Sequence, residues 1–96
     1  MARTIRWSPR AATDFEDICA YIARDSERYA KLFAMKIFKL IEEIPKFPRA
    51  GRVVPEYADE NIRERIYENY RIVYRLKKDA VEVVAIRHGS RQLSNI

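Results

Sequence analysis

The side chains best suited to chemistry in this sequence are its arginines and lysines, its one histidine (His88) and its one cysteine (Cys19). The 96 residues include 19 basic and 14 acidic side chains, a formal net charge of +5. Residues 1–62 hold 11 basic and 10 acidic residues, whereas residues 63–96 hold 8 and 4. A basic C-terminal third predicts a polyanionic or acidic partner, such as nucleic acid, an enzyme that acts on it, or an acidic peptide. The alternative is a soluble basic surface without a special ligand.

Several classes of site are excluded by what the sequence lacks. A single cysteine forms neither an internal disulfide nor a multi-cysteine zinc site, so a reducing, cytoplasmic location is expected. There is no phosphate-binding or dinucleotide-binding glycine pattern and no zinc-ligand spacing, and no serine stands in the context of a catalytic triad. We therefore expect no cofactor and no metal. No apolar run is long enough for a transmembrane helix or a signal-peptide core, so no membrane partner is expected.

Two amphipathic helices are predicted in the first half of the chain. Ser8 and Pro9 suit the start of the first helix, since serine is a good N-cap and proline at the first helical position loses no needed N–H. Asp25 or Ser26 can cap the second helix, and Pro45 ends it. The apolar stripes are Ala11, Phe15, Ile18 and Ile22, and then Ala30, Phe33, Ile37, Leu40, Ile41 and Ile44. The short break between them predicts an antiparallel helix hairpin.

Strand-like alternation occupies most of the remaining chain. A short strand is expected at residues 4–7, and three more follow an irregular segment, at residues 62–67, 70–76 and 80–87. The last of these is apolar on both faces, which predicts a central position in the sheet. We expect one α+β domain over residues 1–96, in the order β-α-α-β-β-β. The two-helix hairpin should pack on one face of a small, mainly antiparallel sheet.

The same alternation divides the side chains of residues 70–77 between two faces of the sheet. Tyr70, Ile72, Tyr74 and Leu76 share the face that should meet the helices. Arg71, Val73, Arg75 and Lys77 share the other. The sequence therefore predicts an exposed, arginine-lined face on the side of the sheet away from the helix hairpin.

Motifs along nearly the whole chain resemble the RelE/ParE superfamily of bacterial toxins from toxin–antitoxin pairs. The motifs are Trp7-Ser8-Pro9 before a helix, the loop Pro48-Arg49-Ala50-Gly51-Arg52-Val53-Val54-Pro55-Glu56, the strand Tyr70-Arg71-Ile72-Val73-Tyr74-Arg75, and Ile86-Arg87-His88-Gly89-Ser90-Arg91. The opening helix and the Gly-Arg-x-Val-Pro-Glu loop look closer to the ParE branch than to the RelE branch.

The resemblance implies a toxin held silent by a cognate antitoxin, whose C-terminal segment wraps the toxin in a hetero-oligomer. ParE-like members poison DNA gyrase without known hydrolytic chemistry, and this is the favoured function. RelE-like and YoeB-like members cleave mRNA on the ribosome, which is the alternative. A second alternative is a basic interaction module that has lost toxicity. For a gyrase inhibitor, we expect toxicity to depend on exposed arginines and on the tail from Gly89 to Ile96.

If the chain is an endoribonuclease, the resemblance assigns catalytic roles to three residues. Glu56 matches the carboxylate base of YoeB-like members, Arg71 their phosphate-binding arginine and His88 their histidine acid. Such cleavage needs a base for the 2′-OH, an acid for the leaving oxygen and cations around the phosphorane, and no metal. Further phosphate- or target-binding candidates are Arg52, Arg75 and Arg91.

Two departures separate the chain from the nuclease branches. YoeB-like members place a tyrosine directly after the histidine and end there, whereas this chain has Gly89 and continues to Ile96. RelE-like members use a lysine-rich patch in the loop before the second strand, where this chain offers Arg49 and Arg52. The RelE-type catalytic set therefore does not transfer.

Each candidate also has a purely structural interpretation. His88 can close the last strand with a hydrogen bond. Glu56 can be solvated, or can pair with Arg52 or with an arginine of the sheet. The sheet arginines can form cross-strand ion pairs, for which the acidic partners would be Glu64, Glu68 or Glu82. Exposed pairs of this kind contribute at most about 1 kcal/mol.

Overall fold

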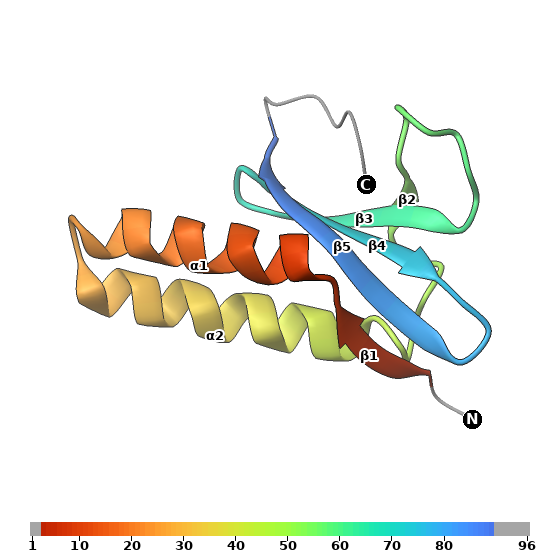
Figure 1. The fold of residues 1–96 in the computed structure, drawn as a ribbon, viewed down its shortest axis with the longest axis horizontal. Helices are drawn as coiled ribbons and strands as arrows, with labels where there is room; N and C mark the ends of the chain where they lie inside the picture. Colours follow the sequence, from red (N-terminus) through yellow and green to blue (C-terminus); the bar gives the residue numbers. More distant parts are fainter. Residues whose placement is uncertain (1–2, 90–96) are drawn as a thin grey trace.

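The computed structural model describes residues 3–89 and consists of two helices and five strands (Figure 1). In chain order these are β1 (Thr4–Trp7), α1 (Pro9–Ala23), α2 (Glu27–Glu43), β2 (Arg52–Val53), β3 (Ile62–Tyr67), β4 (Tyr70–Leu76) and β5 (Ala80–His88). The predicted α+β class and helix hairpin are confirmed. The two-residue strand β2 was not predicted, and it lies within the segment that the sequence marks as irregular.

Both helices begin at serine caps. The Ser8 hydroxyl accepts a hydrogen bond from the Ala11 N–H at 3.0 Å, and Pro9 takes the first helical position of α1. Of the two residues that can cap α2, Ser26 does so, accepting from the Tyr29 N–H at 3.0 Å. Each side chain satisfies one of the N–H groups that a helix start leaves unpaired. Among residues 3–89, no helix has both the length and the apolar character needed to cross a membrane.

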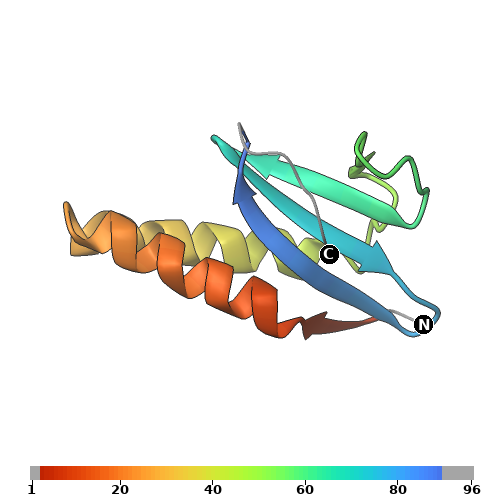
Figure 2. The ribbon, with the colours of Figure 1, turned by 45° about the horizontal axis from the view of Figure 1, so that its top comes forward.

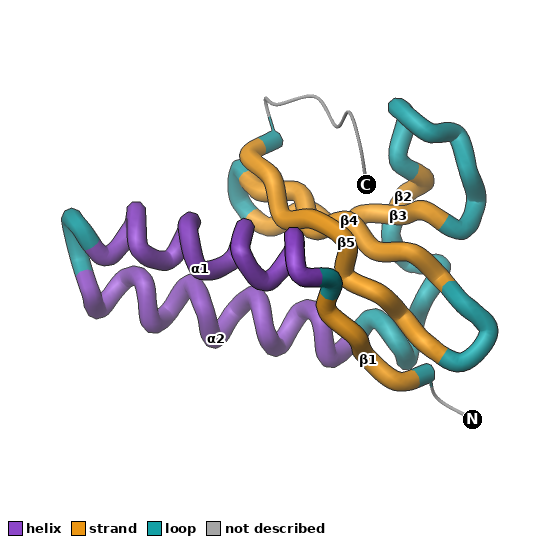
Figure 3. Tube along the Cα trace, viewed as in Figure 1, coloured by secondary structure: helices purple, strands orange, loops and turns teal. Residues whose placement is uncertain are grey.

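The sheet has the strand order β1-β5-β4-β3-β2, with β1 parallel to β5 and the other neighbours antiparallel (Figure 3). The last strand, β5, lies inside the sheet between β1 and β4 as its apolar faces predict, although the middle strand of the five is β4. A β-bulge interrupts the pairing of β4 with β5, because Val73 lies opposite Ala85 whereas Tyr74 lies opposite Val83. The unpaired Val84 shifts the alternation along β5. Val83 and Ile86 consequently both belong to the cluster under the helices, while Val84 and Ala85 belong to another cluster.

Two apolar clusters lie on opposite faces of the sheet. The larger one fills the space between the sheet and the helix hairpin, which covers one face (Figure 2). The smaller one consists of Val54, Ile62, Val73, Val84 and Ala85, with Tyr57 packed against it. Two of its contributors, Val54 and Tyr57, come from the segment between β2 and β3. This segment, residues 54–61, therefore covers part of the sheet face that the helices leave open.

Candidate functional site: a buried arginine–carboxylate network

The predicted arginine-lined face is organised around Arg71, which is buried. Arg71 lies on β4 opposite Ile66 of β3, and Glu64 lies two residues before Ile66 on the same strand. Alternate residues of a strand share a face, so Glu64 is a diagonal neighbour of Arg71 within reach of its long side chain. Glu56 approaches from the segment 54–61. Two strands and one loop thus bring one guanidinium and two carboxylates together.

The hydrogen bonds of this network engage all three nitrogens of the Arg71 guanidinium. Its Nε donates to Glu64 Oε1 at 2.6 Å, while Nη1 and Nη2 donate to the two oxygens of Glu56 at 2.7 and 2.8 Å. The pairing with Glu56 is bidentate, which is the strong geometry for arginine and a carboxylate. Only 7% of the Arg71 side chain is exposed, against 0% for Glu64 and 18% for Glu56.

A second arginine, Arg52, also binds Glu64. Arg52 Nε donates to Glu64 Oε2 at 2.5 Å, and 60% of the Arg52 side chain is exposed. Each oxygen of the buried Glu64 carboxylate therefore accepts from a different guanidinium. The pKa of Arg71 is raised above its ordinary value, mainly by its hydrogen bonds to Glu56. Glu64 adds to this effect, whereas burial opposes it. Among the described residues, the network contains two arginines and two glutamates, whose formal charges cancel.

The prediction that Arg71 is exposed is wrong, because residues 54–61 fold over this face of the sheet. Arg75 shares the face, as its strand parity predicts, and its side chain is partly exposed. Its Nη1 lies 3.6 Å from Glu82 Oε1, and Lys77 Nζ lies 3.2 Å from the same oxygen. The cross-strand pairs Arg71–Glu64 and Arg75–Glu82 are both present. Val73, under the segment 54–61, separates the two arginines, so they form no continuous cationic groove.

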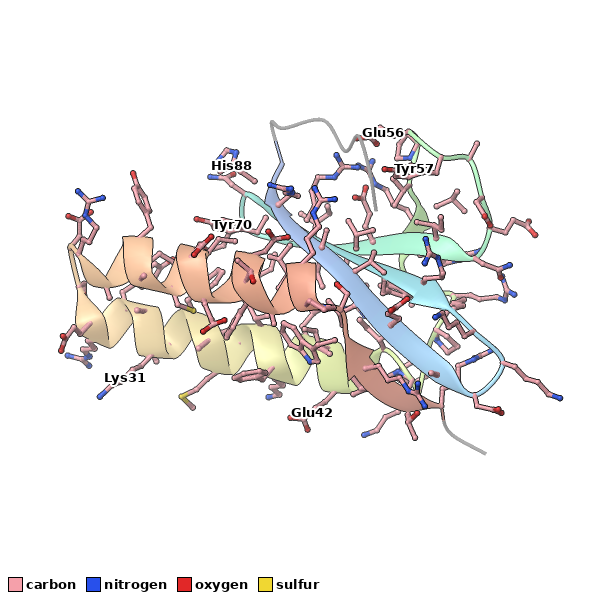
Figure 4. All side chains as sticks on the ribbon, viewed as in Figure 1. Lys31, Glu42, Glu56, Tyr57, Tyr70 and His88 are labelled. Atoms are coloured by element: carbon pink, nitrogen blue, oxygen red, sulfur yellow. The ribbon has the colours of Figure 1, made fainter. Side chains whose placement is uncertain are left out.

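His88 ends β5 directly opposite Tyr70, and their ring centroids are 5.8 Å apart in an edge-to-face arrangement. Figure 4 shows His88 and Tyr70 at the same end of the sheet, with Glu56 and Tyr57 on the loop beyond it. A cavity of about 310 Å³ lies at this end, and its lining includes Arg52, Arg71 and His88. The structure therefore brings three of the sequence-predicted residues to one depression. Glu56 does not line this cavity, but it pairs with Arg71, which does.

The remaining candidates have different outcomes. Arg75 does not line this cavity. Arg91, together with most of the predicted tail from Gly89 to Ile96, lies outside the described residues. Glu64 was considered only as an ion-pair partner, although it is the most deeply buried member of the network. The alternation Ile62-Arg63-Glu64 carried the necessary information, because it places a carboxylate on the same face as Arg71. Across residues 3–89 there is no group of three or more histidine, cysteine or acidic side chains that could hold a metal ion.

The fold and the matched residues define a class of protein. The family model described as "ParE toxin of type II toxin-antitoxin system, parDE" matches residues 5–93, so the chain belongs to this family. It is accordingly a toxin of a type II toxin–antitoxin system within the RelE/ParE superfamily, as the sequence motifs imply.

Particular relatives agree with this assignment. The chain is 28% identical over 92 residues to "Putative toxin Y4kP" of Sinorhizobium fredii (strain NBRC 101917 / NGR234), covering 94% of this chain and 92% of that protein. The solved chromosomal ParDE system from P. aeruginosa superposes with a TM-score of 0.74 at 17% identity, covering 91% of this chain and 96% of the other. The YoeB dimer from Staphylococcus aureus gives a TM-score of 0.60 at 17% identity, covering 92% and 98%. These two structures share the fold.

Proposed function

We propose that the protein arrests growth by binding DNA gyrase, without hydrolytic chemistry of its own, and that a cognate antitoxin neutralises it. The family match and the likeness to a solved ParDE system support the toxin and antitoxin parts of this proposal. The choice of gyrase over mRNA depends on whether Glu56, Arg71 and His88, the residues that a nuclease of this superfamily would use, are available to an RNA substrate.

The observation that carries this choice is the bidentate pair between Arg71 and Glu56. A base must accept the proton of the 2′-OH, and a phosphate-binding arginine must offer its N–H groups to the substrate. Here Glu56 accepts from Arg71 with both oxygens, and the third nitrogen of Arg71 donates to Glu64. An RNA phosphate would have to approach a guanidinium of which only 7% of the side chain is exposed, and would compete with the carboxylates already bound to it.

The alternative is a ribosome-dependent mRNA endoribonuclease using Glu56, Arg71 and His88. Its specific support is that Arg71 and His88 both line the 310 Å³ cavity. The fold likeness to YoeB is compatible with both functions. In this alternative the Arg71–Glu56 pair is a resting arrangement that opens when RNA binds.

Two assays on the purified protein separate these functions. The first measures supercoiling of relaxed plasmid by purified gyrase, and the second uses primer extension to map cuts in mRNA on translating ribosomes. We expect gyrase inhibition and intact mRNA. Codon-linked cuts that vanish in a folded His88→Ala variant would establish the nuclease instead. Absence of both effects, with no growth defect on induction, would indicate a non-toxic interaction module.

The antitoxin is tested separately. We expect the product of the small open reading frame next to the toxin gene to co-purify with this protein and to restore growth when both are induced. Failure of both would remove the antitoxin from the proposal while leaving the gyrase assay unaffected.

A further inference from the structure

A second cavity lies on the helix side of the same end of the sheet, between α1 and the paired ends of β4 and β5. Its volume is about 520 Å³, larger than that of the cavity beside Arg71. The residues that line it are Asp14, Asp17, Ile18, Tyr21, Tyr70, Ile86, Arg87 and His88. Figure 4 shows that Tyr70 and His88, which form one wall, lie next to α1. None of the nuclease roles assigned to Glu56, Arg71 and His88 involves the α1 residues of this lining.

The charges in this cavity differ from those of the chain as a whole. Asp14 and Asp17 both come from α1. Asp14 Oδ2 accepts a hydrogen bond from the Ile86 N–H at 3.0 Å and lies 4.0 Å from Arg87 Nε, so Asp14 and Arg87 offset each other. Asp17 is exposed, and among residues 3–89 no ion pair involves it. Among the described residues that line the cavity, Asp17 is therefore the carboxylate that no ion pair offsets, in a protein whose formal net charge is +5.

The cavity also presents aromatic rings. Tyr21 is 66% exposed, so its ring is accessible to a partner. The Tyr70 ring is half-buried and contacts the His88 ring edge to face. The guanidinium carbon of Arg24 lies 5.8 Å from the centre of the Tyr21 ring, so this ring already attracts a guanidinium within the chain. Aromatic faces and a carboxylate together favour a planar cation.

We propose that this cavity binds an arginine side chain carried by a segment of a partner protein. The guanidinium pairs with Asp17 and stacks against the tyrosine rings, and the exposed body of Tyr21 packs against the rest of the partner segment. Arginine fits better than lysine because its planar, weakly hydrated group stacks on aromatic rings while donating to a carboxylate. Asp14 and Asp17 disfavour a phosphate or a nucleic acid strand. The inference concerns residues outside the Arg71 network, so it does not depend on whether gyrase is the target.

The test uses a small probe and its uncharged isostere. N-acetyl-L-argininamide is titrated into the ¹⁵N-labelled protein at pH 7.5 and followed by amide chemical shifts, in parallel with N-acetyl-L-citrullinamide, which has the same shape without the charge. We expect saturable shifts around Asp17, Tyr21 and Tyr70 with the arginine probe, and at least tenfold weaker binding of the citrulline probe. Inorganic phosphate should cause no shifts at these residues.

Variants locate the binding. Asp17→Asn should weaken binding of the arginine probe at least fivefold, whereas Asp25→Asn, a matched change of an exposed carboxylate beyond the end of α1, should leave it unchanged. Tyr21→Leu should also weaken binding while keeping an apolar side chain on this exposed helix position. Each variant is checked for an unchanged fold from its amide spectrum. Equal binding of the two probes, equal binding by Asp17→Asn, or saturable shifts confined to other parts of the protein would each overturn the proposal.

Discussion

Replacing Arg71 with methionine should destabilise the fold far more than the same replacement of Arg52, although both arginines bind Glu64. The side chain of Glu64 is fully buried, and its carboxylate is held by one buried and one largely exposed guanidinium. Breaking a buried ion pair from one side costs about 3–5 kcal/mol, because an uncompensated charge stays behind. Arg52 still binds Glu64 after the change, so we expect a loss of about 3 kcal/mol. That is a large part of the 5–15 kcal/mol typical of small domains.

The matched control is Arg52→Met. Its side chain is 60% exposed, and the energy of an ion pair in water is reduced by solvent screening. Arg71 continues to neutralise Glu64 in this variant. We therefore expect a loss of at most about 1 kcal/mol.

A double variant tests the physical reason behind the first value. When Glu64→Leu is combined with Arg71→Met, no buried charge remains on the two strands, and apolar replacement of a complete buried pair is often close to neutral. The double variant should therefore be more stable than Arg71→Met alone. The Glu56 side chain is 18% exposed, so water reaches it more readily than it reaches Glu64.

The measurement is urea unfolding at pH 7, followed by the fluorescence of Trp7, the sole tryptophan, with far-ultraviolet circular dichroism as a second probe. Equal slopes with denaturant concentration confirm that each variant unfolds from a similarly compact state. The reasoning is refuted if Arg52→Met costs as much as Arg71→Met, or if the double variant is the least stable of the three.

Three further predictions concern the positions that shape the fold around the network. Gly51→Ala should lower the free energy of unfolding by about 1–3 kcal/mol, because an added Cβ would collide with Tyr74 Oη and lie 2.7 Å from the Glu64 carbonyl oxygen; an unchanged urea midpoint contradicts this. Ser8→Ala should cost about 1–2 kcal/mol, because it removes both the cap on Ala11 and the hydrogen bond that the Ser8 hydroxyl donates to the Val84 carbonyl; an unchanged thermal midpoint contradicts this. Burial raises the pKa of Tyr74 above its ordinary value of 10, so the folded protein holds the phenol proton more tightly than the unfolded chain does. The free energy of unfolding should therefore not depend on this group below pH 10 and should fall as the pH rises above 10. Unfolding measured from pH 8 to 11.5 should show this fall, and Tyr74→Phe should make it shallower; an equally steep fall in the variant counts against the assignment.

The helices and the three long strands could be predicted because their information is local. A stripe such as Phe33, Ile37 and Ile41 specifies a helix and its buried face within a few turns. Alternation in residues 70–76 likewise assigned each side chain of β4 to the correct face. Residues 80–87 are rich in valine and isoleucine and carry apolar side chains on both faces, which indicated a strand with neighbours on both sides. Each of these patterns repeats several times, so an ambiguous residue at one position does not change the predicted element or its buried face.

The features that were missed depend on contacts between distant segments. β2 has two residues, too few for alternation to be visible. The bulge at Val84 lies in a run of apolar residues, where a change of face leaves the pattern of polar and apolar positions unaltered. The path of residues 54–61 over the sheet was also hidden, because only Val54 is buried and only Tyr57 is half-buried there, which is too few positions to form a pattern. That path decides the burial of Arg71, so the missed loop and the missed burial have a single cause.

The same loop explains why residue types alone left the role of Glu56 and Arg71 open. A glutamate and an arginine that converge on one spot can serve as base and phosphate ligand, or can neutralise each other, and the two roles need opposite environments. Catalysis needs both groups to reach substrate, whereas neutralisation favours burial and bidentate pairing. The structure has Val54 and Tyr57 packed on the sheet on either side of Glu56, which places its carboxylate against Arg71. Apolar packing on both sides of Glu56 thus holds this part of the loop where the carboxylate meets Arg71.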